Sequence, residues 1–168
     1  MIEFMVIGYP RSCTAWMSNW LTTDTTHCIH DPLFQYHYDE LDGIESKKML
    51  GISCTGIVMF KEWLVKHPAR KLIIHRDIND VNESLRRIGL DAIPRFDIDY
   101  IDGIHIEHEQ LFDNPKKIYE YLVQKDFDEE RFIALKDLNI QRSLEAVTIN
   151  PRILEELRNT HGICSNRG

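Results

Sequence analysis

The chain has 168 residues, of which 43% are hydrophobic and 28% are charged. This length is typical of one domain and the apolar share can supply one core, so we expect a single domain over residues 1–168. The net charge of −7 argues against a basic nucleic-acid-binding surface and against a surface for anionic membranes, so we expect neither partner.

Apolar runs alternate with amphipathic segments along the chain. We expect strands near residues 3–8, 26–30, 48–54, 71–76 and 104–108. The amphipathic segments predict helices near residues 14–23, 56–66, 78–89, 114–124, 129–137 and 151–160. Residues 89–103 show no clear period and predict a loop, and residues 162–168 are expected to fray. The alternation is typical of an α/β fold with a mainly parallel sheet of about five strands.

The turn after the first predicted strand is the most informative segment, and it reads Gly8-Tyr9-Pro10-Arg11-Ser12-Cys13-Thr14-Ala15-Trp16. The first backbone N–H groups of a helix lack internal partners and carry the positive end of its dipole, so such a turn can bind an anion. Arg11 adds a fixed positive charge, and Ser12 and Thr14 add hydroxyl donors. The alternative is an ordinary capped turn whose arginine faces solvent, because Pro, Ser and Thr are common at helix starts.

Two other kinds of phosphate loop do not fit this turn. A Walker A loop needs Gly and Lys where Cys13 and Thr14 stand. A cysteine phosphatase loop needs an arginine six residues after its cysteine, and none of the four cysteines has one.

The turn resembles the 5′-phosphosulfate loop of the sulfotransferase family, which reads Pro-Lys/Arg-Ser-Gly-Thr-Thr-Trp/Leu. Residues 10–16 agree with that pattern at five of seven positions. Cys13 replaces the glycine, which makes the backbone less free to be left-handed, and Ala15 replaces the second threonine, which removes one hydroxyl. The resemblance implies a phosphosulfate-binding role for Arg11, Ser12, Cys13, Thr14, Ala15 and Trp16. For Trp16 two roles are open, stacking on adenine and packing in the core.

A second segment resembles the family's 3′-phosphate motif, an Arg-Asp at a strand end with a serine eight residues after the arginine. Arg76 ends the predicted strand near 71–76, and Ser84 follows it by eight residues on the next predicted helix. Asp77 can cap that helix, and Ser84 lies on its flank. The resemblance implies that Arg76 and Ser84 hold the 3′-phosphate. Taken alone, the two residues equally allow an arginine paired with a local carboxylate and an exposed serine.

A third likeness, in residues 104–115, is to the family's strand ending in Tyr/His-Glu-Asp-Leu with an Asp-Pro helix start after it. Its implied role is structural. The resemblance spans about residues 4–125 and implies a three-layer P-loop-like fold.

The second predicted strand ends in His30-Asp31-Pro32, which is similar to a segment that follows this strand in related sulfotransferases. Ligands of open parallel sheets bind at the carboxyl ends of the strands, and imidazole titrates near working pH, so His30 can remove a proton from an acceptor. Asp31 is an alternative base, a partner that orients His30, or a cap of the turn. Ser53 and Thr55 follow the third strand, where they either meet the nucleotide or cap the next helix.

The histidines around the second strand do not predict a metal site. His27 and His30 point to opposite faces of a strand, and Cys28 and His37 complete no tetrahedral set with them. We therefore expect no metal.

The resemblance implies a small sulfotransferase that transfers the sulfuryl group of 3′-phosphoadenosine 5′-phosphosulfate (PAPS) to a hydroxyl or amine. Its implied catalytic residues are His30, Asp31 and Arg11. The main alternative is a non-catalytic nucleotide-binding module of the same fold, since Cys13 and Ala15 depart from the loop pattern. A nucleotide or nucleoside kinase is less consistent with a loop that lacks lysine. The acceptor pocket is expected in residues 33–47 and 90–103, whose sequence names neither the acceptor nor an oligomeric state.

The cysteines and the apolar runs bear on the compartment. The four cysteines show no CxxC spacing and no dense disulfide pattern. No apolar run reaches the roughly 20 residues of a membrane helix, and the first residues lack the features of a signal peptide. We therefore expect a reducing, cytoplasmic setting.

Overall fold

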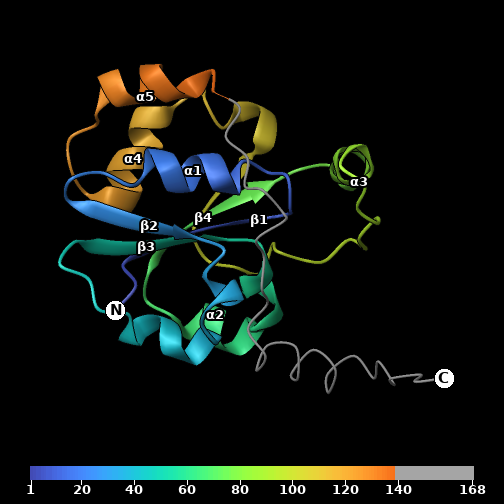
Figure 1. Ribbon diagram of the computed structural model, residues 1–168, viewed down its shortest axis with the longest axis horizontal. Coiled ribbons are helices and arrows are strands. Elements are labelled where there is room, and N and C mark those ends of the chain that lie inside the picture. The colour runs from blue at the N-terminus through green and yellow to red at the C-terminus, as the bar shows by residue number, and fades with distance from the viewer. Residues whose placement is uncertain (139–168) are drawn as a thin grey trace.

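A five-stranded parallel sheet forms the centre of the protein in the computed structural model, which describes residues 1–138 (Figure 1). The sheet order is β2-β3-β1-β4-β5, and all four strand pairs are parallel. The strands are β1 (Phe4–Gly8), β2 (Thr26–His30), β3 (Met49–Cys54), β4 (Arg70–His75) and β5 (Ile104–Glu107). This sheet, with helices around it, confirms the predicted three-layer α/β fold.

Five α-helices connect and flank the strands within the described residues. They are α1 (Thr14–Trp20), α2 (Lys61–Lys66), α3 (Ile78–Arg87), α4 (Pro115–Val123) and α5 (Glu129–Lys136). Four short 3-10 helices accompany them: η1 (Pro32–Phe34), η2 (Tyr38–Gly43), η3 (Gly56–Met59) and η4 (His108–Gln110). The helix predicted near 151–160 and the tail at 162–168 lie outside the described residues.

Two of the predicted helices differ from the structure. The one predicted at 14–23 ends at Trp20, before a polar turn that leads into β2. The one predicted at 56–66 is divided into η3 and α2, because the backbone of Phe60 leaves the helical region with φ −104° and ψ 57°. The Phe60 ring stacks on Tyr38, with centroids 4.2 Å apart, so tertiary packing fixes the break.

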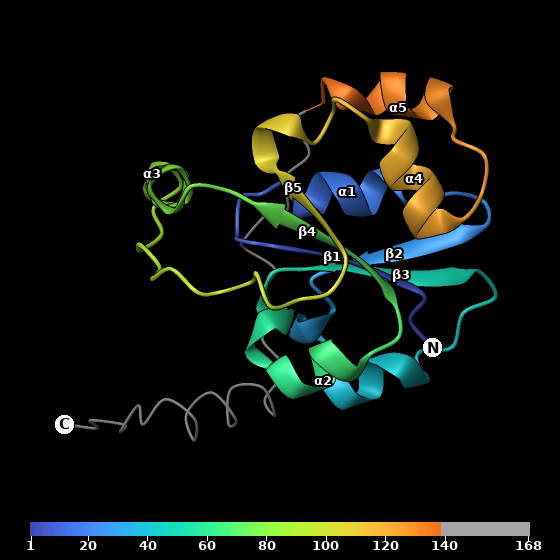
Figure 2. The ribbon, with the colours of Figure 1, turned by 180° about the vertical axis from the view of Figure 1, so that it is seen from behind.

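Each face of the sheet has its own apolar core, as the alternation of side chains along a strand requires. On β1, Phe4 and Val6 face the core that α1, α4 and α5 cover, whereas Met5 and Ile7 face the core on the side of α2 (Figures 1 and 2). Gly51, the register partner of Phe4 on β3, makes room for the Phe4 ring, because a Cβ there would lie 2.1 Å from it.

The carboxyl ends of all five strands point to the same edge of the sheet, because the strands are parallel. Helix α3 lies beyond this edge and off the two helical layers (Figures 1 and 2). The loop predicted at 89–103 contains no helix or strand, but buried Ile98 and Ile101 attach it to the core on the side of α2. The edge therefore gathers the segments that follow the strands. None of the helices within residues 1–138 is long and apolar enough to cross a membrane.

Candidate functional site

The turn between β1 and α1 has an unusual backbone. Arg11 and Cys13 both have left-handed conformations, with φ 68° and φ 62°. Ser12, which lies between them, donates a hydrogen bond from its N to Tyr9 O at 3.2 Å. Helix α1 begins with the hydrogen bond from Met17 N to Cys13 O at 2.9 Å. Residues other than glycine adopt this conformation at a cost of about 1–2 kcal/mol each. Cys13 thus has the backbone conformation for which glycine is best suited, at the position where the sulfotransferase loop has glycine.

Ser12 lies under this turn and is completely buried. Its Oγ has no hydrogen-bond partner within residues 1–138. The turn is packed closely against β4, because a Cβ on Gly8 would come within 2.9 Å of Ile74 O. A buried hydroxyl without a partner is costly, and such a group is expected where a ligand or water completes the site.

The two predicted phosphate motifs meet in space. Arg11 Nε donates to Ser84 Oγ on α3 at 3.0 Å. Arg76, directly after β4, donates from its guanidinium to Arg11 O. The Nε of Arg76 is buried and has no partner among the described residues. Two guanidinium groups and a serine hydroxyl therefore converge beside the turn, with Arg11 as the link between Arg76 and Ser84.

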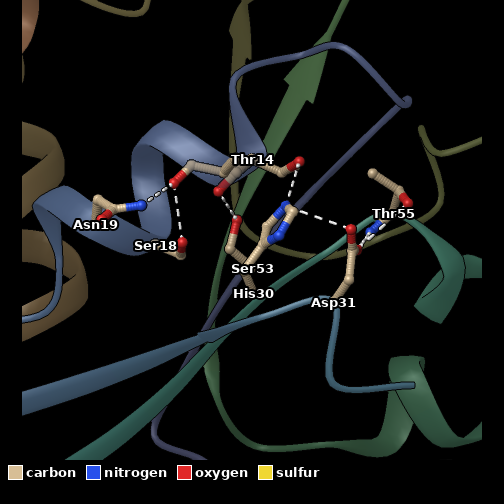
Figure 3. A network of polar contacts seen from close by, with 8 residues as sticks. Thr14, Ser18, Asn19, His30, Asp31, Ser53 and Thr55 are labelled. Atoms are coloured by element: carbon tan, nitrogen blue, oxygen red, sulfur yellow. Dashed lines mark hydrogen bonds and ion pairs between the residues drawn. The ribbon is translucent and has the colours of Figure 1, made fainter. Parts of the chain in front are cut away.

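A polar network joins the ends of β2 and β3 to the start of α1 (Figure 3). His30 Nε2 lies 3.3 Å from Thr14 Oγ1 and 3.3 Å from Asp31 Oδ2. The other carboxylate oxygen of Asp31 accepts from Thr55 N at 3.0 Å and from its hydroxyl at 3.4 Å. Ser53 Oγ donates to Thr14 O at 2.8 Å. The side chains of His30 and Asp31 are only 17% and 16% exposed, so the network fixes both of them.

These contacts separate roles that the sequence left open. Asp31 has a left-handed backbone, with φ 44°, and its side chain bridges Thr55 and His30. It therefore has the geometry of the partner that orients His30. Ser53 and Thr55 brace Thr14 and Asp31, and the structure shows no hydrogen bond by which the Thr55 side chain caps η3.

Trp16 has a core position, which favours the second of its two open roles. It is 4% exposed, and its Nε1 donates to Leu135 O at 2.8 Å. Its ring contacts Trp20, Phe112 and Phe132. The neighbouring Ala15 accepts from the Ser18 and Asn19 side chains through its carbonyl, as Figure 3 shows for the two donors.

One contact at the loop was not predicted. Cys13 Sγ lies 3.4 Å from His108 Nε2, and His108 Nδ1 lies 3.4 Å from Glu109 Oε1. Burial raises the pKa of the Cys13 thiol, although Arg76 and Arg11 act in the opposite direction. Burial, followed by the charge of Arg76, lowers the pKa of His108. At neutral pH the pair is therefore a thiol and a neutral imidazole, not an ion pair. His108 follows the carboxyl end of β5 directly, so its location at this edge of the sheet could have been predicted from the sequence.

Tyr9 and Phe96 form a second contact that was not predicted. Their rings lie 4.2 Å apart, Tyr9 OH donates to Phe96 O at 2.5 Å, and Phe96 N donates to Tyr9 OH at 3.0 Å. This contact attaches the 89–103 loop to the turn after β1. Beside it lies a cleft of about 260 Å³ that Tyr9, Arg76 and residues 95–99 line.

The carboxyl edge is preferred over a larger surface hollow elsewhere. That hollow, of about 880 Å³, lies among residues 23–25, the end of α4 and the start of α5, and it contains none of the predicted site residues.

A comparison with protein-family models found no match, and neither did a search of curated proteins. We therefore infer the function from the residues and contacts at the carboxyl edge of the sheet.

Proposed function

We propose that the protein is a PAPS-dependent sulfotransferase whose site is the carboxyl edge around the turn after β1. The observation that carries this proposal is the convergence of the two motifs: Arg11, Arg76 and Ser84, which are up to 73 residues apart, meet through direct hydrogen bonds. Two arginines at one turn create a positive potential that favours a bound anion. The chain as a whole has a charge of −7, so this local concentration of positive charge is specific to the site.

The residues fit the nucleotide as follows. The turn at 10–14 and Arg11 bind the 5′-phosphosulfate end, and the buried Ser12 Oγ, which has no partner within the described residues, must be uncovered before it can donate to the ligand. Arg76 and Ser84 bind the 3′-phosphate. PAPS supplies the activated sulfuryl group, and the positive charge of Arg11 and the loop amides stabilises charge on the leaving phosphate.

His30 is the proposed base. Its Nε2 faces the Asp31 carboxylate, which only accepts, so in the neutral ring Nε2 carries the proton and the basic lone pair is on Nδ1. Asp31 is itself held by a hydrogen bond from Thr55 N. A neutral acceptor hydroxyl is a poor nucleophile, and a positioned imidazole removes its proton. The acceptor is a hydroxyl or amine compound.

The module without catalysis is retained as a second candidate because of one observation. The Cys13 side chain, which the family's glycine lacks, contacts His108 beside the turn. A side chain at this position reduces the space next to the turn. Such a loss of space is consistent with a protein that binds the nucleotide but does not transfer a sulfuryl group.

Titration calorimetry with 3′,5′-adenosine bisphosphate tests the binding part of the proposal. Loss of a charged hydrogen bond costs about 1.5–3 kcal/mol, so we expect Arg76→Ala to bind about 10- to 100-fold more weakly than the unaltered protein. The matched control is Arg87→Ala, because Arg87 is exposed at the end of α3 and pairs with Glu83. The control should bind normally. Absence of binding by folded protein at millimolar ligand would refute the proposal.

A turnover assay separates the enzyme from the module. The unaltered protein is incubated with PAPS and a panel of hydroxyl and amine acceptors, and sulfated products are measured by mass spectrometry. Sulfated product supports the transferase. Bisphosphate binding without any product supports the module, and magnesium-dependent binding of ATP in place of the bisphosphate supports the kinase.

A further inference from the structure

A cluster of possible metal ligands lies beside the cleft next to Arg76, and two of its three members, His75 and Asp99, line that cleft. It consists of His75, at the end of β4, His105, on β5, and Asp99, in the 89–103 loop. One ligand atom from each of the three lies within 4.8 Å of the other two. In the described part of the chain, these are the residues that gather as a possible metal site.

The fold itself brings the two histidines together. β4 and β5 are adjacent parallel strands in which Ile73 pairs with His105 and His75 pairs with Glu107. The histidines are therefore diagonal neighbours on the two strands. Their rings lie nearly parallel with centroids 5.0 Å apart, and His75 Nε2 lies 2.7 Å from His105 Nδ1.

The hydrogen bonds of His105 prepare it to act as a ligand. Its Nε2 lies 2.7 Å from the carbonyl oxygen of Ile101, and a carbonyl can only accept, so Nε2 carries the proton. In the neutral ring, Nδ1 then presents its lone pair to His75. A histidine that donates its other N–H to a carbonyl is the usual arrangement around a bound metal.

The third member adds a negative charge. Asp99 Oδ1 lies 3.6 Å from His75 Nδ1, and the Asp99 side chain is 72% exposed, so it is free to move toward an ion. The cleft lining holds three further carboxylates, Asp77, Asp97 and Glu107, and two arginines, Arg76 and Arg95.

We infer that His75, His105 and Asp99 bind a divalent transition-metal ion of the zinc type, with water in the remaining positions. Imidazole with one carboxylate suits Zn²⁺ and related ions better than Mg²⁺. Two nitrogens on one tetrahedral zinc ion lie about 3.3 Å apart, so the rings must separate by about half an ångström from their present contact. The proton that His75 Nε2 donates to His105 Nδ1 must also leave when the ion binds, and it moves to His75 Nδ1, which faces Asp99. The bound ion would tie the 89–103 loop to β4 and β5. This inference departs from the sequence-based expectation of no metal, which considered only the histidines near β2.

Titration calorimetry of the full chain with Zn²⁺, without nucleotide, tests the site. We expect one saturable site for Zn²⁺ and none for Mg²⁺. His105→Ala should weaken zinc binding at least about tenfold, and His75→Ala should do the same, because each removes a ligand. The matched control is His27→Ala, since His27 is exposed on β2, and it should bind zinc normally.

Two further measurements keep the result unambiguous. His105→Ala also removes the hydrogen bonds to Ile101 and His75, so its melting temperature without metal is measured to show that the variant is folded. With Co²⁺ as the probe, we expect visible bands without thiolate charge transfer, because no cysteine belongs to the site. No saturable binding at millimolar Zn²⁺, or binding that persists in the double variant His75→Ala/His105→Ala, would overturn the inference. Neither outcome bears on bisphosphate binding, which is measured separately.

Discussion

Cys13 has the backbone conformation that the proposed anion site needs, although the sulfotransferase loop pattern has glycine at this position. The sequence indicated that a cysteine would be less free than glycine to be left-handed, and the structure nevertheless gives it φ 62° and ψ 16°. Its side chain contacts His108 and packs beside the core under α1. Strained backbone of this kind is concentrated at functional sites, which is why the conformation supports the proposed anion site.

This conformation predicts an inverted order of stability for two substitutions. At an ordinary position alanine is more stable than glycine by roughly 0.5–1 kcal/mol, but left-handed backbone costs alanine about 1–2 kcal/mol. Cys13→Gly should therefore be more stable than Cys13→Ala by roughly 0.5–1 kcal/mol. Urea unfolding of both variants measures the difference in unfolding free energy. Both variants lack the Cys13 thiol, so the loss of its contacts largely cancels in the comparison. A more stable alanine variant would show that Cys13 is not left-handed in solution.

Asp42 gives a prediction about pH. Burial alone would raise its pKa, but hydrogen bonds from Ile2 N and from His67 hold the pKa below its ordinary value. A carboxyl whose pKa is lower in the folded state stabilises the protein above its unfolded pKa, near 4. That contribution is lost as the pH falls through the folded pKa.

We therefore expect Asp42→Asn to be less stable than the unaltered protein at pH 7, with a difference that shrinks as the pH approaches 3. Urea unfolding at a series of pH values measures this. Asp24→Asn, at an exposed position before β2, is the control and should give a small difference that does not vary in this way. A constant difference for Asp42→Asn across the series would mean that its charge does not contribute.

At the scale of elements, the contact between β1 and β3 depends on a glycine. The Phe4 ring is completely buried and occupies the space where a Gly51 side chain would lie. Gly51→Ala should destabilise the protein by about 1–3 kcal/mol, because a buried ring and the strand next to it must shift. Gly43→Ala is the matched control, since a Cβ there meets nothing within 4 Å. Equal unfolding free energies for the two variants would contradict this packing.

All five strands could be predicted from the sequence, although only some are apolar runs: β1 reads Phe-Met-Val-Ile-Gly, whereas β5 alternates as Ile-His-Ile-Glu. The helix boundaries were harder. The division at Phe60 depends on a ring contact with Tyr38, 22 residues earlier, and a local pattern contains no information about that contact. The 3-10 helices η1 and η2 were missed because such short turns leave no hydrophobic period to detect.

At the scale of the molecule, the sequence predicted which segments meet but not how they touch. A parallel sheet places Arg11, His30 and Arg76 at one edge whatever the details. The particular contacts, such as Arg11 with Ser84 and Cys13 with His108, join residues 73 and 95 positions apart. Contacts of this kind depend on strand order and loop path, which the local sequence does not specify.

The central claim is that two motifs at this edge bind the two ends of one nucleotide. The most direct test is a structure of the protein with 3′,5′-adenosine bisphosphate. We predict the 5′-phosphate on the turn at residues 10–14 and the 3′-phosphate within hydrogen-bond distance of Arg76 and Ser84. A bisphosphate bound away from this turn, or with both phosphates distant from Arg76, would contradict the account.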